Sequence, residues 1–373
     1  NRNLISDVPL SIALSGGIDS SLIYGYANSN NKVKGITVKM DDKSFDESHV
    51  ATSFSNFLKA PHKIINLHFD DKIELLDRLL LHFDQPFADS SLIPFYFLNK
   101  EARKYSKVLI GGDSGDELHN GYLGFSVLPF LLNTKSFNFS INQIINFAKI
   151  FCNNSNYRTL TKLQNLYKQS SLKDTLFLWH SWFPTSNELT PLNAFKKSSF
   201  SPSINFFNEL NYPKDINSAI IMNYFRARMQ SDFLRKSDMM SMINSVEFRV
   251  PMLDEDLTQF SLSIPSSQKS SLFKSKKILR SIHSDMYRGL NSNLKKQGFT
   301  IPLDLWLGKN NIEYIIDFLL RKDGIVISYI NEEYINILKE SLVENKNRKF
   351  ISRASAYQRL LQLYALQIWY INK

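Results

Sequence analysis

The sequence predicts an α/β protein, with a doubly wound parallel sheet followed by a large, mostly helical C-terminal part. Two observations support this prediction. In residues 1–130, short apolar runs alternate with segments of helical periodicity, which is the pattern of parallel strands joined by helices. From residue 220 to the end, apolar residues recur at helical spacing, and the pattern is broken at Pro251, Pro265 and Pro302.

The alternating part is expected to form strands separated by helices. The expected strands are Val8–Leu14, Val33–Val38, His62–Leu67 and Lys107–Ile110. The expected helices are Ser21–Asn28, Ser48–Leu58, Lys72–Phe83 and Ile93–Lys104. Because parallel strands place their carboxyl ends at one edge of the sheet, a ligand is expected at that edge.

The remaining residues fall into two further parts. Residues 131–219 are rich in Asn, Ser, Lys and Phe and are expected to be a variable helical insertion, whereas residues 220–373 complete the domain with helices. Within the insertion, the expected helices are Ile141–Phe151 and Leu172–Trp182, and the expected loops are Asn153–Tyr157 and Lys196–Ser203. The segment Ala354–Tyr370 has apolar residues at helical spacing and is expected to be a core helix.

Composition limits the class of protein. The chain has 373 residues, of which 43% are hydrophobic and 21% charged, as in ordinary globular proteins. The single cysteine, Cys152, excludes a disulfide framework and any Cys-x-x-Cys site within this sequence, and the apolar runs are far too short to span a membrane. We therefore expect a cytoplasmic location and no membrane partner. The net charge of +10 suits anionic ligands, but the basic residues are scattered, which makes nucleic acid an unfavoured partner.

A glycine turn follows the first expected strand. It reads Leu14-Ser15-Gly16-Gly17-Ile18-Asp19-Ser20-Ser21. Adjacent glycines let the backbone approach a ligand closely, and the free amides at the start of a helix attract phosphate. A carboxylate beside a phosphate requires a cation between them, so Asp19 is interpreted as a Mg²⁺ ligand. Alone, Ser-Gly-Gly is more often a plain turn, but its place between a strand and a helix indicates a pyrophosphate-binding loop.

A second glycine turn follows the strand Lys107–Ile110. It reads Gly111-Gly112-Asp113-Ser114-Gly115-Asp116-Glu117-Leu118-His119-Asn120-Gly121-Tyr122. Crowded carboxylates raise one another's pKa unless a cation neutralises them. Asp116 is therefore interpreted as a second Mg²⁺ ligand opposite Asp19, although the same turn taken alone is equally compatible with an acidic surface loop.

Two further segments carry charged residues. Residues 234–254 are expected to be mostly helical up to Pro251, and Glu247 and Arg249 fit a structural ion pair as well as they fit a functional one. The basic residues of 276–280 and 295–296 are suited to neutralising charge on a phosphoanhydride, or to a solvated basic loop.

These motifs together resemble those of the asparagine synthetase family, in its C-terminal synthetase domain of the PP-loop (adenine nucleotide α-hydrolase) type. The first turn resembles the PP-loop of ATP pyrophosphatases, and three more segments match the family in order: residues 112–122, 241–254 and 296–299. The resemblance implies that residues 1–130 are the ATP-binding core. It also implies adenylation of a carboxylate, most readily aspartate, with Mg²⁺ and ATP, followed by transfer of ammonia to give an amide, AMP and pyrophosphate.

The resemblance also implies a role for individual residues. Leu14 and Val38 would contact the adenine side of ATP, and Gly111 and Gly112 would line the AMP moiety. Asp113 would assist the attack of ammonia, and Lys296 would stabilise the pentacovalent phosphorus and the leaving pyrophosphate. Pyrophosphate would be held by the loop residues Ser15, Gly16, Gly17, Ser20 and Ser21, and Mg²⁺ by Asp19 and Asp116.

Three departures from the family pattern keep alternatives open. Asparagine synthetases usually have Glu at the position of Asp113, and Leu294 and Lys295 replace a common Arg-Pro. The glutaminase domain that precedes this domain in the family is absent from the sequence, so ammonia would come from such a domain or a partner, or another amine is the nucleophile. A ligase of the same family that acts on a sugar acid, a peptide or another metabolite is therefore the alternative function. A tRNA-modifying PP-loop enzyme is an alternative of another class, which the lack of paired cysteines disfavours. A homodimer is the candidate assembly.

Overall fold

The computed structural model describes residues 2–29, 32–39, 46–66, 72–134, 138–151, 153–169, 171–180, 210–271, 274–290, 303–344, 346 and 351–373. The chain forms two compact units, each assembled from segments that are separated in sequence. Unit 1 comprises Asn1–Asp70, Ser91–Ser126 and Ile221–Pro302, and unit 2 comprises Asp71–Ser90, Val127–Ile220 and Leu303–Lys373. The predicted division into three consecutive parts stays a prediction.

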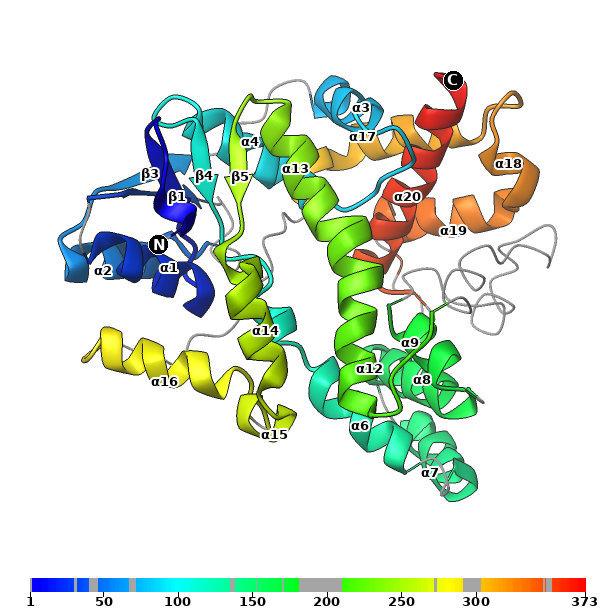
Figure 1. Cartoon of the computed structure of the whole chain (residues 1–373). Coiled ribbons are helices and arrows are strands. Elements are labelled where there is room, and N and C mark those ends of the chain that lie inside the picture. Colours follow the sequence, from blue (N-terminus) through cyan, green and yellow to red (C-terminus); the bar gives the residue numbers. More distant parts are fainter. Residues whose placement is uncertain are drawn as a thin grey trace. The chain divides into compact units, whose positions relative to one another are not determined.

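Unit 1 is built on a five-stranded parallel sheet (Figure 1). The strand order is β3-β2-β1-β4-β5, so β1 lies at the centre, between β2 and β4. The bounds are Leu10–Ala13 (β1), Lys34–Lys39 (β2), His62–Asn66 (β3), Val108–Ile110 (β4) and Glu247–Arg249 (β5). The predicted parallel sheet is confirmed, and each of the four expected strands is present with shorter or slightly shifted bounds.

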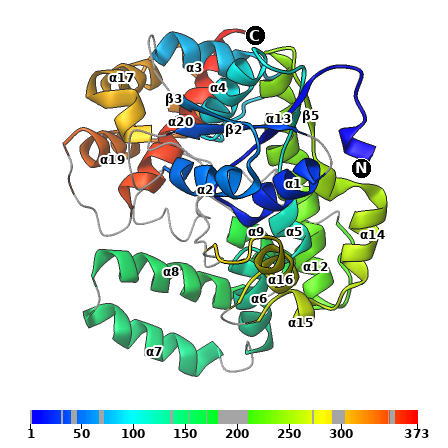
Figure 2. The same ribbon diagram turned by 90° about the vertical axis from the view of Figure 1, so that its left-hand side faces the viewer.

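Helices cover both faces of this sheet, as in doubly wound proteins. Helices α1 (Ile18–Asn28) and α2 (Ser48–Leu58) lie on one side, whereas α4 (Leu92–Ala102) and α13 (Leu234–Met242) lie on the other (Figures 1 and 2). The sheet contributes fully buried apolar side chains such as Ile12, and helix α1 contributes Tyr24 to the same core cluster. Burial of such side chains stabilises the fold, at roughly 1.5–3 kcal/mol for each large apolar residue.

Strand β5 corrects the prediction for residues 234–254. The structure ends helix α13 at Met242, and Glu247–Arg249 then joins the sheet beside β4, with Val108 opposite Glu247. Its three residues, Glu-Phe-Arg, show no apolar run that would mark a strand. The strand forms because β4 offers a free edge, which is a tertiary influence that local sequence does not contain.

The remaining elements that the structure describes in unit 1 are helices. The long helix that enters from α12 (Ile216–Asn223) passes through a π-helical stretch, Tyr224–Phe233, before α13 begins. The shorter elements are η1 (Arg2–Leu4), α5 (Gly115–Leu118), η5 (Pro251–Leu253), α14 (Glu255–Ser263), α15 (Ser266–Lys269) and α16 (Lys277–Met286). Pro251 opens η5 and Pro265 precedes α15, so both prolines stand at helix boundaries, as predicted.

Unit 2 is all helical in its described residues. It contains α3 (Lys72–Leu81), most of α6 (Gly124–Asn133), α7 (Asn138–Phe151), α8 (Asn154–Lys168), α9 (Leu172–His180), α17 (Leu303–Leu319), α18 (Val326–Tyr329), α19 (Glu332–Leu342) and α20 (Arg353–Ile371). The predicted core helix Ala354–Tyr370 is confirmed as α20, which buries Tyr364 against α3 through a 2.5 Å hydrogen bond to Asp77. No helix in the described part of the chain is long and apolar enough to cross a membrane.

One expected loop of unit 2 is wrong. Residues 154–157 begin α8, and the Asn153 side chain caps this helix by accepting a hydrogen bond of 2.9 Å from the Asn156 amide. Asparagine is favoured both in loops and at helix N-caps, so composition alone did not separate the two. The second expected loop, Lys196–Ser203, lies outside the described residues, as does Cys152.

Candidate active site

The first glycine turn joins the central strand to a helix. The Leu14 amide donates to the Ile36 carbonyl at 2.9 Å, which holds the end of β1 against β2. Gly17 is the N-cap of α1 and has no side chain to cap the helix. The amides of the first turn therefore lack intrahelical acceptors, and the positive end of the helix dipole faces the turn. This geometry suits an anionic ligand.

The serines of this turn form a local network. Ser15 Oγ and Ser20 Oγ lie 2.8 Å apart, and the amides of Gly17 and Ser15 donate to Ser15 Oγ and Ser20 Oγ at 3.1 Å each. Ser21 is fully buried and its hydroxyl donates to the Ile18 carbonyl. Ser15 and Ser20 thus hold the shape of the loop. Their hydroxyls can rotate, so these two serines are better candidates than Ser21 for donating a hydrogen bond to a ligand.

The second glycine turn packs directly on the first. Gly111 continues β4, and its amide donates to the Arg249 carbonyl of β5 at 2.9 Å. A Cβ on Gly112 would lie 2.9 Å from the Ser20 amide nitrogen and 3.2 Å from Asp19 Cβ. Only glycine therefore fits at position 112 without displacing the start of α1. Both turns follow the carboxyl ends of the adjacent strands β1 and β4, at the edge of the sheet where a ligand is expected.

A buried lysine joins the two loops. Lys276 Nζ forms ion pairs with Asp19 and, at 2.7 Å, with Asp116 Oδ1. All three side chains are largely buried, with Lys276 at 8% exposure. Burial alone would lower the Lys276 pKa, but the two carboxylates together raise it above its usual value. Lys276 is therefore a permanent cation between the carboxylates, which come from residues nearly a hundred positions apart.

The donor set at this position fits a magnesium ion. Mg²⁺ in nucleotide enzymes is commonly held by one or two carboxylates together with substrate phosphates and water. Asp19 and Asp116 converge closely enough to share one cation, the Lys276 ammonium. Within the described residues, no group of three or more His, Cys, Asp or Glu side chains could hold a metal by itself. A metal here would accordingly need oxygen ligands from a phosphate or from water.

The other predicted site residues are placed as follows. Leu14 lies buried just beyond β1, and Val38 lies buried in β2, opposite Ile65 of β3. Gly16 packs against α2, where a Cβ would meet Glu47 Cβ at 3.0 Å. Asp113 is partly buried in the turn before α5. Lys296 lies outside the described residues.

The sequence did not predict that Lys276 in particular would pair with the two carboxylates. The basic residues of 276–280 were noted as a group suited to phosphate, but nothing in the sequence distinguished Lys276 from Lys277, which instead donates to the Ser267 carbonyl. The distinguishing feature is conformational, because Lys276 has a left-handed backbone (φ 52°) just before α16. Such a conformation is unusual for lysine and marks a position held by its surroundings.

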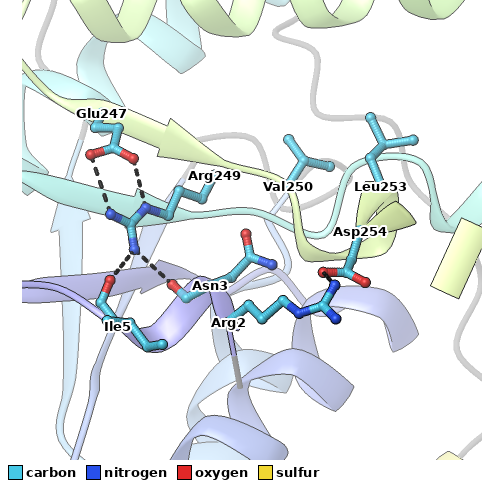
Figure 3. Close-up of a pocket in the computed structure, with 8 residues that line it drawn as sticks. All are labelled: Arg2, Asn3, Ile5, Glu247, Arg249, Val250, Leu253 and Asp254. Atoms are coloured by element: carbon cyan, nitrogen blue, oxygen red, sulfur yellow. Dashed lines mark hydrogen bonds and ion pairs between the residues drawn. The ribbon is translucent and has the colours of Figure 1, made fainter. Parts of the chain in front are cut away.

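A pocket of about 560 Å³ lies beside β5 (Figure 3). Arg249 donates to both oxygens of Glu247 and, through Nη1, to the carbonyls of Asn3 and Ile5 at 3.0 and 2.7 Å. The pocket contains none of the residues predicted to bind ATP, Mg²⁺ or pyrophosphate. The Glu247–Arg249 pair thus has a structural role, because it fastens the segment before β1 to the edge of the sheet. The lining residues are Arg2, Asn3, Ile5, Glu247, Arg249, Val250, Leu253 and Asp254.

Comparison with known proteins gives a consistent result. The chain is 28% identical to asparagine synthetase 1 (glutamine-hydrolyzing) of Bacillus subtilis over 93% of its own length and 54% of that protein. It is 24% identical to a putative glutamine-hydrolyzing asparagine synthetase of Mycobacterium tuberculosis over 82% of the chain and 47% of the relative. It is also 25% identical to amidase chyE of Penicillium rubens over 82% of the chain and 51% of the relative.

The chain therefore spans about half the length of these curated relatives. The family described as Asparagine synthase matches residues 1–371, which is nearly the whole chain. Together with the parallel sheet and the two glycine turns at its carboxyl edge, this match establishes that the protein belongs to the Asparagine synthase family.

Proposed function

We propose that this chain is the synthetase part of an ATP-dependent, amide-forming ligase. A substrate carboxylate attacks the α-phosphorus of ATP, and pyrophosphate leaves. Ammonia then attacks the acyl-adenylate, AMP departs, and an amide forms. Aspartate is the first candidate substrate, which would make the product asparagine.

The observation that carries this proposal is the meeting of Asp19, Asp116 and Lys276 beside two glycine turns. Opposite charges are concentrated here at the carboxyl edge of a parallel sheet, next to the amides of a helix N-terminus. This arrangement favours a polyanion with an accompanying cation, as a nucleoside triphosphate provides. The similarity to asparagine synthetases supports the same reading.

Each group has a chemical task in this proposal. The amides at the start of α1 and the hydroxyls of Ser15 and Ser20 bind pyrophosphate, and Lys276 offsets its charge. Asp19 and Asp116 would hold Mg²⁺, which when bound neutralises negative charge on the phosphates. Lys296 stabilises the phosphorus under attack, and Asp113 accepts a proton from the incoming ammonia. Orientation and charge stabilisation thus supply most of the catalysis.

The nitrogen source is a separate part of the proposal. The chain covers only about half the length of the relatives whose names include glutamine hydrolysis. We infer that ammonia reaches this domain from a glutaminase domain or a partner protein, and that the enzyme works in the cytoplasm. A homodimer is compatible with this function.

The test is release of pyrophosphate from ATP and Mg²⁺ in the presence of ammonium and aspartate. Asp19→Asn is expected to lower the rate at least a hundredfold, because it removes a carboxylate that would hold Mg²⁺, and the Mg²⁺ would neutralise charge on the reacting phosphates. Asp7→Asn, at an exposed aspartate of the same unit, is the matched control and should keep the wild-type rate. Equal rates for Asp19→Asn and wild type would overturn the assignment of Asp19.

A second candidate is a ligase of the same family that acts on another carboxylate. Asp113 stands where asparagine synthetases usually have glutamate, and one relative is named an amidase rather than an asparagine synthetase. In the same assay, release with a sugar acid or peptide acid but not with aspartate would support this candidate. Release with aspartate alone would support asparagine synthesis.

A further inference from the structure

Three buried polar groups beside the site have no hydrogen-bond partner among the residues that the structure describes. They are Lys269 Nζ, His119 Nδ1 and Asn120 Oδ1. Lys269 is 1% exposed, and His119 and Asn120 are 4% and 1% exposed. Buried polar groups are nearly always paired in folded proteins, so a cluster of three requires an explanation.

The three groups belong to one place in unit 1. Asn120 Nδ2 donates to Ser270 Oγ at 3.1 Å, which joins the turn after α5 to the residue that follows Lys269. His119 Nε2 lies 3.5 Å from Ser261 Oγ of α14. Burial, together with the charges of Lys269 and Lys276, lowers the His119 pKa to about 4, so both lysines lie near this ring.

The cluster also adjoins the carboxylate pair of the site. His119 and Asn120 follow directly after α5, whose first turn carries Asp116. Lys276, which pairs with Asp116, stands directly before α16, seven positions after Lys269 at the end of α15. Lys276 thus neutralises the carboxylates of Asp19 and Asp116. Lys269, in contrast, forms no ion pair with a carboxylate of the described residues.

An unpaired buried ammonium is costly. Burial without a counter-charge disfavours the charged form, and it lowers the Lys269 pKa. If the role of Lys269 were only structural, methionine would fill the same space without the free-energy penalty of burying an unpaired charge. A residue kept at the expense of stability is typical of a functional position.

We propose that Lys269, His119 and Asn120 form an anion subsite for the terminal phosphate of ATP, which becomes the distal phosphate of the pyrophosphate product. The subsite rests on the proposed function and adds to it a means of distinguishing a triphosphate from AMP. Lys269 supplies the charge and His119 an imidazole N–H. Asn120 can turn its amide by 180°, accept from the Ser270 hydroxyl, and present its N–H groups to the anion.

The test is direct binding to the intact protein, measured by calorimetry with inorganic pyrophosphate and with AMP. Lys269→Met should weaken pyrophosphate roughly tenfold to a hundredfold, as expected for losing a charge-assisted contact, and leave AMP within about twofold. Lys322→Met, at an exposed lysine, removes the same charge and should change neither affinity. Thermal unfolding without ligand should show Lys269→Met to be at least as stable as wild type.

Two outcomes would overturn the subsite. Unchanged pyrophosphate affinity in Lys269→Met would exclude a contact with the phosphate. Equal weakening of pyrophosphate and AMP, or a lower unfolding temperature, would make Lys269 a structural residue. Failure of the proposed function has a different signature, namely wild-type protein that releases no pyrophosphate with any carboxylate.

Discussion

Lys276 is the residue on which the charge balance of the site depends. Two carboxylates as close as Asp19 and Asp116 would otherwise repel each other, and each would raise the other's pKa. The lysine offsets this repulsion within a largely buried site, where charges interact more strongly than in water. The same three charges that prepare the site for a nucleotide therefore also contribute to the stability of the ligand-free protein.

Removing this lysine should destabilise the fold through the carboxylates that remain. We expect Lys276→Met to lower the free energy of unfolding at pH 7 by about 3–5 kcal/mol, as breaking a buried ion pair usually does. Adding Asp116→Asn should restore part of the loss, because one of the two uncompensated charges is then gone. Urea unfolding measures both effects, and a double variant no more stable than Lys276→Met would contradict the argument.

At the scale of elements, helix α16 holds the start of α1 in place. Tyr287, just after α16, donates to the Ser21 carbonyl at 2.6 Å, and its ring contacts Phe54 of α2. His283 of α16 is fully buried, and neither ring nitrogen has a hydrogen-bond partner among the described residues. Burial, with a smaller contribution from Arg280, lowers the His283 pKa to about 4.

This histidine predicts a loss of stability in mild acid. Its pKa is about 4 in the folded protein, against an ordinary value of 6.5, so the unfolded chain binds the proton more tightly. The stability that depends on a neutral His283 is fully present above pH 6.5 and is lost as the pH falls toward 4. When the pH is lowered from 7.5 to 5, we expect His283 to lower the free energy of unfolding by about 2 kcal/mol, which urea unfolding at the two pH values measures. His283→Phe should show a correspondingly smaller difference between the two pH values, and an unchanged difference would contradict the assignment.

Arg249 has a comparable positioning role at the edge of the sheet. Its side chain fastens the backbone of Asn3 and Ile5, while its carbonyl accepts from the Gly111 amide at the site. We expect Arg249→Gln to lower the free energy of unfolding by about 1–2 kcal/mol and to speed amide exchange in residues 2–8.

Arg321→Gln is the matched control for this prediction. Arg321 likewise donates two hydrogen bonds to the carboxylate of Asp323, two residues away. Among the described residues, however, no backbone carbonyl accepts a hydrogen bond from the Arg321 side chain. Because this pair is exposed and screened by solvent, its loss should leave the free energy of unfolding nearly unchanged. Equal effects of the two substitutions would show that the backbone contacts of Arg249 contribute nothing.

The sequence predicted the elements whose signal is local. The runs that became β1 to β4 are marked by apolar residues, and the glycine turns are recognisable because their chemistry is contiguous in sequence. Strand β5 was not predictable in this way, since Glu-Phe-Arg becomes a strand only beside β4. The pairing of Asp116 with Lys276 was not predictable either, because only the folded chain brings these distant residues together.

At the scale of the whole molecule, each compact unit is assembled from separated segments. Unit 1 takes residues from the beginning, from the middle and from positions 221–302 of the chain, and unit 2 takes the segments between and after them. The division predicted from the sequence, into residues 1–130, 131–219 and 220–373, reflects changes in composition along the chain and not contacts in the folded protein. A protein whose sheet is completed by residue 249 has many contacts between residues that are far apart in sequence, which slows folding and makes its parts depend on one another.

This dependence predicts that residues 1–130 do not fold when expressed alone. The fragment would retain β1 to β4 and both glycine turns, but β4 would become an exposed edge and α4 would lose its packing against α13. Met240 and Val246, both fully buried in the intact chain, would no longer cover that face. We expect circular dichroism and guanidinium titration to show no cooperative unfolding of the fragment, whereas the full chain unfolds cooperatively. A sharp transition in the fragment would instead show that the first 130 residues are an autonomous domain.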